Sequence, residues 1–353
     1  MWKYNIIKDW DSVWETGHLK EWERLLHESP TSHVFFHPTL VKIWIDTYMP
    51  LRDLAPIFMW AKDDMDNVAF LPLVLWKRNW KGAFLHSIIP VGYSDYDYHD
   101  PLFKDIPSME SLSAFWKGVL EALEVYSCDE ILLTGFRDRC IATDGRWEKG
   151  EICPYLDLAE ITTEESLMSF FDTKLRGDIR RQIRRLNELG KLRFVEYDSA
   201  KDIPVGLFEQ FIDAHSKKWP NAYKAPNFHR LLVESCGEGM PVHFSVMMLG
   251  NTPIAWHLGF EYQGIYYYYM PAGNPEYQKF SSVKIHLYYL ITRAIERGYR
   301  LYDHLRGDET YKSGWSNGCQ YVNDRAVIDG GISSKIKHGL IKLKALLGLS
   351  VRK

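Results

Sequence analysis

The alternation of apolar and polar positions in the first half of the chain predicts helices followed by strands. Apolar residues recur at helical spacing from Ser12 to Leu26, and the pattern stops before Ser29-Pro30. Two apolar segments flank the polar stretch 63–67, as in a β-hairpin. The first half is therefore expected to hold helices at 12–26, 38–48 and 108–126 and strands at 55–62, 68–76, 84–91 and 130–135.

The second half repeats this order of elements. A strand at 153–158 precedes a long helical region at 163–189, whose acidic start suits the positive end of the helix dipole. The other expected elements are strands at 191–197, 242–249, 254–261, 265–270 and 299–305 and helices at 204–218, 227–237 and 282–297. The repeat predicts two domains of mixed α and β structure, 1–152 and 153–333, and a tail, 334–353.

The stretch 265–315 is central to the second half, because strand, loop, helix and strand follow one another there as a crossover unit. The first amides of a helix that follows such a loop are unpaired and point outward. The helix start near Ser282 therefore suits an anionic ligand. No glycine-rich phosphate motif stands at this position.

Composition narrows the classes of function. Apolar residues make up 46% and aromatic residues 14% of the chain, which supports substantial cores and argues against disorder. A net charge of −3 argues against a general polyanion binder. Five cysteines without a CxxC pair favour reduced thiols in a cytoplasmic protein, and no metal site is expected. The N-terminus does not resemble a signal peptide, and no apolar run is long enough to span a membrane.

Several enzyme classes lack their sequence motifs. GxSxG, HExxH, the P-loop and GxGxxG do not occur. Serine-nucleophile, zinc-protease, nucleotide-hydrolase and dinucleotide-binding functions therefore have no support.

A strongly basic segment lies in the long helical region. Residues 173–194 hold eight basic and two acidic side chains, and Asp172 directly precedes them. Arg176, Arg180 and Arg184 are four residues apart and share one helix face. They are candidates to hold the phosphate of a nucleotide, an RNA or a phospholipid-linked acceptor, the alternative being a solvated helix face. The predicted buried face carries Leu175, Ile179, Ile183 and Leu186.

His257 is a candidate catalytic residue. Strand alternation puts it on one face with Ala255, Gly259 and Glu261, where a histidine and a carboxylate could line a cleft. It is a candidate base or neutral hydrogen-bond donor. The alternative is a strand histidine that only makes structural hydrogen bonds.

The segment 303–315 concentrates charge at the end of the last strand, where ligands of sheets often bind. Arg306 could hold an anion, and Glu309 or Asp308 could accept a proton. Alternatively, Arg306, Glu309 and Lys312 pair with one another. The candidate site residues in this segment are Asp303, Arg306, Glu309, Tyr311, Lys312 and Trp315.

The tail is basic and amphipathic. Its six basic residues are Lys335, Lys337, Lys342, Lys344, Arg352 and Lys353, and it has no acidic residue. Leucines and isoleucines are interleaved with them, which is typical of a helix that lies on an anionic membrane. The alternatives are a helix docked on the protein and a frayed terminus.

Two segments resemble the second domain of the FemAB-like and CelD-like acyltransferases of the GNAT N-acyltransferase superfamily. They are IAWHLGFEYQGIYYYYMPAGNPEYQKFSSV and RAIERGYRLYDHLRGDETYKSGW. The run from Tyr302 to Trp315 carries the aromatic-D-x-LRG-x-E-x-YK-x-x-W hallmark. KLRGDIRRQIRRLNELG is similar to the family's arginine-rich helix, His215 with Trp219 to its H-x-x-x-W region, and FLPLVLWKR fits in the first half.

The resemblance implies an α+β fold of tandem GNAT-like acyltransferase domains, each a mostly antiparallel sheet flanked by helices. It implies an N-acyltransferase that moves an acyl group from acyl-CoA or an acyl carrier protein to an amine on a sugar or amino acid, in cell-envelope or exopolysaccharide biosynthesis. The protein would act in the cytoplasm or at the inner membrane face. The implied catalytic residues are Glu309, His257 and Asp303, and the implied donor-binding residues are Ser281, Ser282, Val283, Lys284 and Arg306.

One turn departs from the family's pattern. Relatives usually carry a small Ser-Pro-Gly type turn where this chain has Ser281-Ser282-Val283. In GNAT folds this turn lets backbone amides approach the donor's pyrophosphate. Val283 is expected to hinder that approach, because a β-branched residue disfavours unusual backbone angles.

Two other functions are compatible with the sequence. One is a FemAB-type aminoacyl transferase that uses aminoacyl-tRNA, with the arginine-rich helix on the RNA. The other is a scaffold of envelope polysaccharide machinery whose donor site has degenerated.

Overall fold

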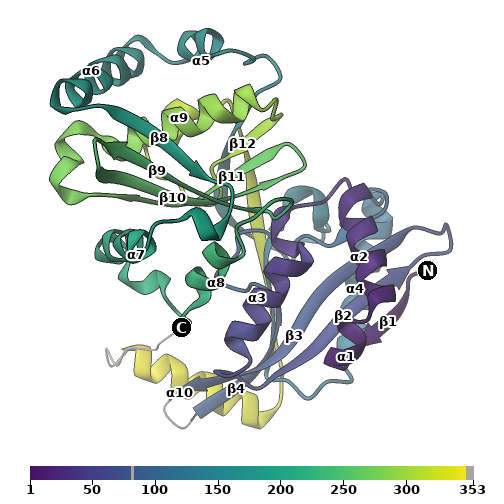
Figure 1. The fold of residues 1–353 in the computed structure, drawn as a ribbon. Helices are drawn as coiled ribbons and strands as arrows, with labels where there is room; N and C mark the ends of the chain where they lie inside the picture. Colours follow the sequence, from purple (N-terminus) through teal and green to yellow (C-terminus); the bar gives the residue numbers. More distant parts are fainter. Residues whose placement is uncertain (81–82, 347–353) are drawn as a thin grey trace. The chain divides into compact units, whose positions relative to one another are not determined.

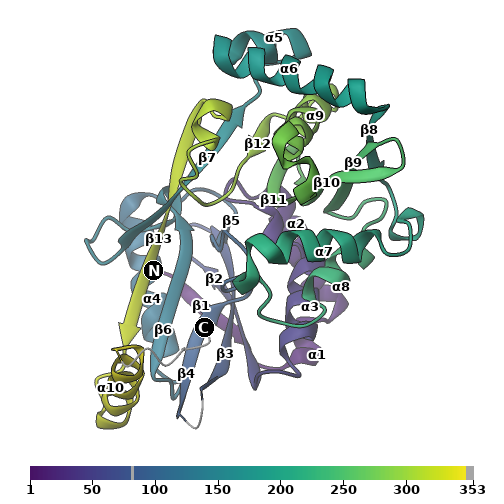
Figure 2. The same ribbon diagram turned by 90° about the vertical axis from the view of Figure 1, so that its left-hand side faces the viewer.

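The computed structural model describes residues 1–80 and 83–346, with the side chains of 78–80, 83–84 and 344–345 left out (Figures 1 and 2). It divides into two compact units: a first unit of Met1–Gly150 together with the chain from Tyr321 onward, and a second unit of Glu151–Gln320. The sequence-based division assigned 321–333 to the second domain. The chain instead returns to the first unit there, because strand β13 (Gly318–Ile328) pairs antiparallel with β6 (Glu130–Arg137).

The first unit contains a mixed, mostly antiparallel sheet in the order β1-β2-β3-β4-β6-β13. The predicted hairpin is present, with Lys62 opposite Val68 across the polar turn. The pairing of β4 with β6 is parallel. The remaining strands of this unit are β1 (Lys3–Ile7), β2 (Leu54–Lys62), β3 (Val68–Trp80), β4 (Ala83–Pro90) and the short β5 (Leu102–Phe103), which pairs with β3.

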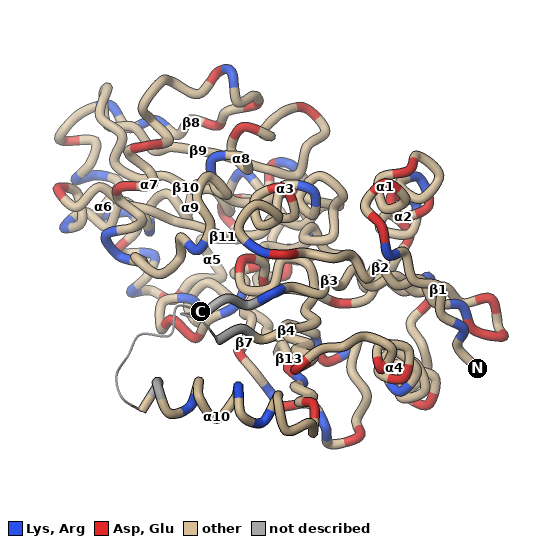
Figure 3. Tube along the Cα trace, turned by 90° about the horizontal axis from the view of Figure 1, so that it is seen from below, with Lys and Arg blue, Asp and Glu red and all other residues tan. Residues whose placement is uncertain are grey.

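Helices cover both faces of this sheet, with α1 to α3 on one side and α4 and α10 on the other (Figure 3). They are α1 (Trp10–Val13), α2 (Thr16–Glu28), α3 (Pro38–Tyr48), α4 (Met109–Leu123) and α10 (Ile332–Leu346), with 3-10 turns at Val34–Phe36 and Asp138–Cys140. The helix predicted at 12–26 is two helices: α1, which the Asp9 carboxylate caps at its start, ends at Val13, and α2 begins at Thr16. Trp22 packs against Phe58 and Phe70, with ring centroids 5.8 and 5.0 Å apart.

The second unit has the sheet order β7-β12-β11-β10-β9-β8. Its pairings are antiparallel except for β11 with β12, which run parallel. The strands are β7 (Glu148–Asp157), β8 (Leu192–Tyr197), β9 (Val242–Leu249), β10 (Thr252–Tyr262), β11 (Ile265–Gly273) and β12 (Leu301–Asp303). The predicted α+β class, with mostly antiparallel sheets flanked by helices, is thus confirmed.

Helices α5, α6 and α9 lie on one face of the second sheet and α7 and α8 on the other (Figure 1). They are α5 (Glu164–Phe170), α6 (Thr173–Leu189), α7 (Leu207–Lys218), α8 (Phe228–Glu234) and α9 (Ser282–Glu296). The long helical region predicted at 163–189 breaks at Phe171–Asp172, where the Asp172 carboxylate accepts a hydrogen bond from the amide of Leu175 and caps α6. No helix in the described ranges 1–80 and 83–346 combines the length and apolarity needed to cross a membrane.

Candidate functional site

The site lies where two parallel strands separate. Strands β11 and β12 pair only from Ile265–Leu301 to Tyr267–Asp303, whereas β11 continues to Gly273. After β12 the chain turns sharply, because Leu305 has a left-handed φ of +58°. The Asp303 carboxylate supports this turn by accepting a hydrogen bond from the amide of Leu305 at 2.8 Å. The end of β11 therefore diverges from the chain that follows β12.

Helix α9 begins at this divergence. A 3-10 turn, Pro275–Phe280, leads to Ser281, which has φ +54° and ψ +41°, and α9 follows at once. The left-handed conformation therefore falls on Ser281, whereas Val283 lies within the first helical turn. From the sequence, Val283 is expected to need an unusual backbone angle. This expectation was wrong, because the left-handed angle belongs to Ser281. The first amides of α9 have no acceptor within the helix and carry its partial positive charge.

A cavity of about 470 Å³ opens between the end of β11, α7 and the start of α9. Its volume falls in the range of small-ligand sites. Tyr268, Leu287 and Trp315 give it an apolar wall, and Ser281 to Lys284 form its edge. The described lining residues include three lysines and no carboxylate. They are Ala214, His215, Lys217, Lys218, Tyr268, Pro271, Ala272, Gly273, Asn274, Pro275, Gln278, Ser281, Ser282, Val283, Lys284, Leu287, Tyr311 and Trp315.

Gly273 allows the strand to approach the helix at this cavity. A Cβ atom on Gly273 would lie 2.6 Å from Cγ2 of Val283, well inside the normal contact distance. The absence of a side chain therefore lets β11 end directly against the first turn of α9.

Two side chains on the cavity wall, His215 and Tyr268, have pKa values shifted by burial. His215, on α7, is buried and its Nδ1 lies 2.8 Å from the hydroxyl of Tyr223. Burial lowers the pKa of His215 to about 4, so it is neutral at pH 7. Burial, helped by the nearby Tyr311 and Glu309, raises the pKa of Tyr268 well above its usual value, so its hydroxyl keeps its proton. The site therefore presents a neutral imidazole and a phenol.

His257 supports Tyr268 from the core side. Their rings stack with centroids 4.4 Å apart and planes 6° apart. His257 is fully buried and is not among the described residues that line the cavity. Burial lowers its pKa well below the usual value, so it is neutral. The structure therefore places His257 behind a cavity residue, with Tyr268 between it and the cavity.

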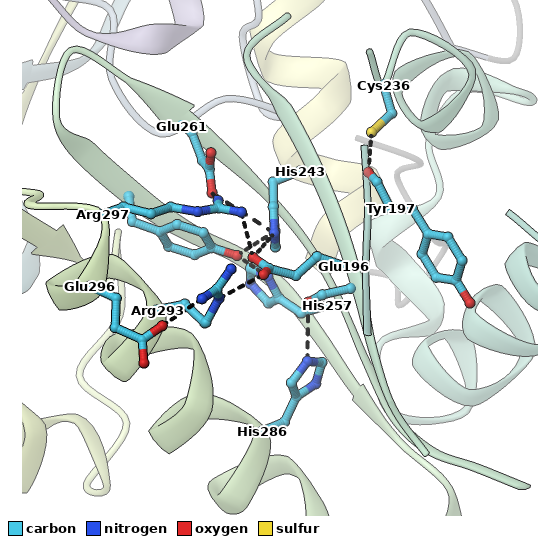
Figure 4. Close-up of polar contacts among 12 residues, drawn as sticks. Glu196, Tyr197, Cys236, His243, His257, Glu261, His286, Arg293, Glu296 and Arg297 are labelled. Carbon is cyan, nitrogen blue, oxygen red and sulfur yellow. Dashed lines mark hydrogen bonds and ion pairs between the residues drawn. The ribbon is translucent and has the colours of Figure 1, made fainter. Parts of the chain in front are cut away.

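A buried chain of hydrogen bonds extends from His257 to the α9 side of the sheet (Figure 4). Glu196 accepts from Nε2 of His243 at 3.0 Å, and the hydroxyl of Tyr266 lies 2.8 Å from Nδ1 of His243 and 2.9 Å from Nδ1 of His257. These contacts form one consistent arrangement: Tyr266 donates to His243 and accepts from His257. Nε2 of His257 then remains as a buried acceptor without a described partner.

Arginines complete this network. Burial opposes ionisation of Glu196, but its bonds to His243, Arg293 and Arg297 lower its pKa to about 2. Ligand atoms of Glu196, His243 and Glu261 lie within 4.8 Å of one another. Arg297 binds both carboxylates, at 3.0 and 2.7 Å, and already supplies the positive charge that a metal ion would bring.

The segment after β12 is held together by Lys312. Its ammonium is buried and donates to the carbonyl of Arg306 at 2.6 Å and to the Glu309 carboxylate at 2.9 Å. Of the predicted mutual pairing among Arg306, Glu309 and Lys312, the structure shows the ion pair of Glu309 with Lys312, and Arg306 takes part through its backbone carbonyl. Glu309 is 42% exposed and does not line the described cavity wall, whereas Tyr311 and Trp315 do. Trp315 also packs edge-on against Phe171, with ring centroids 4.7 Å apart.

The arginine-rich helix contributes to the site with residues other than the predicted three. Arg180 and Arg184 are exposed and Arg176 is half-buried on α6; none of them lines the cavity. A groove beside the cavity, which shares Lys284, Tyr311 and Trp315 with it, is instead lined by Lys174 and Arg181. Asp178 joins the two helices there, because it binds Arg181 at 2.5 Å and Lys284 at 2.6 Å.

Sequence reasoning missed the most prominent polar groups of the cavity. His215 was noted only for its resemblance to a family motif, and Tyr268 was part of an aromatic strand. No spacing rule distinguishes Tyr268 from its neighbours, because it reaches the cavity wall only where β11 separates from β12. Lys174 and Arg181 lay in the basic segment, but helix periodicity alone did not show which of its cations face α9.

Residues 173–313 match the model of the GNAT acetyltransferase domain family. The fold is similar to that of FemX, with a TM-score of 0.57, 12% identity and coverage of 92% of this chain and 98% of FemX. It is also similar to the C-terminal domain of a protein assigned as a lysylphosphatidylglycerol synthetase from Agrobacterium fabrum, with a TM-score of 0.50, 12% identity and coverage of 87% and 95%. No curated protein matches the chain.

Proposed function

From the match of residues 173–313 to the GNAT acetyltransferase domain family and from a fold similar to that of FemX, we propose that the protein is a transferase that moves an acyl group from a thioester donor to an amine. Acyl-CoA, the co-substrate of GNAT domains generally, is the first candidate donor, and an acyl carrier protein is the second. The proposed acceptor is an amine on a sugar or amino acid of the cell envelope or an exopolysaccharide.

The charge and shape of the cavity carry this proposal. Three lysines and the amide end of α9 line a space whose inner wall is apolar, and no carboxylate is among its described lining residues. Lys217 and Lys284 pair with Asp213 and Asp178 outside the lining, so Lys218 and the helix end are the positive groups offered to a ligand. Such a site suits a donor with an anionic arm and an apolar or thioester end. The adjoining groove is lined by three cations, Lys174, Arg181 and Lys284, and by two carboxylates, those of Asp172 and Asp178. Arg181 and Lys284 pair with Asp178, so Lys174 is the groove cation proposed to hold the donor's phosphates.

In the proposed reaction, the amine nitrogen attacks the thioester carbonyl carbon. The C–S bond then breaks, and the sulfur leaves as a thiolate. Tyr268 would donate a hydrogen bond to the carbonyl oxygen or the leaving sulfur, since its hydroxyl stays protonated. Glu309 is the proposed base, which would take the proton that the attacking amine loses, through a water molecule. Its carboxylate is partly exposed and lies near the cavity residue Tyr311, whose pKa is raised by burial and by Glu309. His215, neutral and on the wall, is the competing base.

One observation supports transfer from aminoacyl-tRNA as a second candidate. Arg180 and Arg184 are exposed on α6 beside the groove cations and form no part of the cavity. Arg184 also pairs with Glu188 at 3.9 Å. Exposed cations outside a small-molecule site suit a polyanionic donor. Binding of charged tRNA that weakens steeply with salt would favour this candidate over acyl-CoA.

Filling the cavity tests the proposal. Ala214 is half-buried on the cavity wall, so A214W should place an indole in the space that the donor needs. Q210W is the matched control, because Gln210 is exposed on the same helix and does not line the cavity. Isothermal titration should detect CoA binding to the wild type and to Q210W, and at least about tenfold weaker binding to A214W. Equal affinity of A214W and Q210W for CoA would contradict the proposed donor site.

A further inference from the structure

Helix α10 attaches to the first unit through polar side chains. Ser334 donates a hydrogen bond to Asp129 at 2.7 Å, Lys337 binds Asp129 at 2.8 Å, and His338 lies 3.1 Å from the Glu130 carboxylate. The three residues lie three and four positions apart, so they share one face of the helix. This face fixes the rotation of α10 about its own axis.

The opposite face is apolar and exposed. Five residues recur there at helical spacing: Ile332, Ile336, Leu340, Leu343 and Leu346, with exposed fractions of 79, 57, 43, 53 and 84%. We call these five residues the outward stripe. A helix that packs on its own protein normally buries its apolar face. Here the polar face makes the contact, and the apolar face is the one left outside.

Charge limits what can cover the outward stripe. Ile332–Leu346 contains four lysines and no acidic residue. Lys335 and Lys342 are exposed and flank the stripe, whereas Lys337 is already paired with Asp129. Two copies packed stripe to stripe would bring like charges together. An anionic lipid surface instead accepts apolar side chains at its interface and lysines on its phosphates.

We propose that the outward stripe of α10 binds the surface of an anionic bilayer, with its flanking lysines on the headgroup phosphates. The tail predicted from the sequence was longer, 334–353. Arg352 and Lys353 lie outside the described residues, as does the side chain of Lys344, so the proposal rests on the residues before them. It is independent of the acyl donor.

Vesicle co-sedimentation of the full chain tests the proposal. The wild type should bind vesicles of phosphatidylcholine with phosphatidylglycerol and bind pure phosphatidylcholine at least about tenfold more weakly. I336Q/L340Q/L343Q removes the centre of the stripe with residues that suit an exposed helix, and should weaken binding by about tenfold or more. K335Q/K342Q should weaken binding to the anionic vesicles only.

The matched control removes three exposed apolar side chains elsewhere in the first unit. Met65, Ile106 and Val125 are 87, 55 and 73% exposed, so M65Q/I106Q/V125Q should bind like the wild type. Far-UV circular dichroism checks that each variant is folded. The proposal is overturned if the wild type does not bind anionic vesicles or if the stripe variant binds as the wild type does. It is also overturned if sedimentation velocity shows that the wild type is a dimer and the stripe variant a monomer, because a second copy of the chain would then cover the stripe.

Discussion

The contact between Gly273 and Val283 predicts that G273A lowers stability in the wild type but raises it when Val283 is shortened. A Cβ atom at position 273 would lie 2.6 Å from Cγ2 of Val283, whereas carbon atoms at rest lie about 3.5–4.0 Å apart. Val283 cannot easily rotate away, because a β-branched side chain in a helix is held in one strongly preferred rotamer. G273A should therefore destabilise the protein by about 1–3 kcal/mol, the usual cost of overpacking.

Shortening Val283 removes the clash. In V283A the Cβ atom of residue 283 remains 4.0 Å from the added methyl group, and the next atom, Oγ of Ser282, lies at 3.7 Å. Both are ordinary contacts. Gly273 also does not have a positive φ, so alanine can adopt its backbone conformation. In the V283A background, G273A should therefore stabilise the protein by about 0.4–1 kcal/mol, since alanine restricts the unfolded chain.

Urea unfolding of the wild type, both single variants and the double variant measures this coupling. The shift in midpoint, at an unchanged dependence on urea, reports the change in stability. The expected interaction energy is about 1.5–4 kcal/mol, well above the error of such cycles. If G273A changes the unfolding free energy equally in the wild type and in V283A, the contact with Val283 is not the reason that position 273 requires glycine.

Two further predictions concern charge. E309Q should lower kcat/KM by about 10²–10⁴. It should change the unfolding free energy by less than about 1 kcal/mol, because the position is partly exposed and the glutamine oxygen can still accept a hydrogen bond from the buried Lys312. Full activity in E309Q together with its loss in H215Q would transfer the role of base to His215. Burial lowers the pKa of His286 to about 3, so below pH 6.5 the unfolded chain takes up a proton that the native state refuses, and stability falls as the pH falls. The wild type should therefore lose about 1.2 kcal/mol of stability relative to H286Q when the pH falls from 6 to 5. Urea unfolding at several pH values, kept above the range where Glu196 takes up protons, measures this difference. A difference in stability that does not change with pH would contradict the prediction.

The sequence predicted most elements of the fold, because periodicity reports which face of an element is buried. It predicted the hairpin around 63–67, the meander ending in β11 and the helix that became α9. It missed the return of the chain at Tyr321, since a strand's apolar pattern does not reveal which sheet it joins. It also joined α5 to α6, because the break depends on a single carboxylate, Asp172, which caps the second helix.

The site was predictable only in part. The turn 281–284 and the residues Tyr311 and Trp315 meet at the cavity as a set, which agrees with the stretch singled out in the sequence. His257 and Glu309 are ionisable residues near the cavity, but they are not among its described lining residues. His257 is kept from the cavity by its burial behind Tyr268, and Glu309 is held by its ion pair with Lys312. Neither placement follows from the apolar and polar pattern of the sequence.

The return of the chain to its first unit also concerns synthesis and truncation. Strand β13 completes the sheet beside β6, and α10 attaches to Asp129 and Glu130. A ribosome therefore makes the whole second unit before the first unit receives its last strand. A fragment that ends at Gly150 would leave β6 as an open edge, which invites pairing with other chains. The second unit is in effect an insertion in the first, so the two halves of the sequence are not two independent folding pieces.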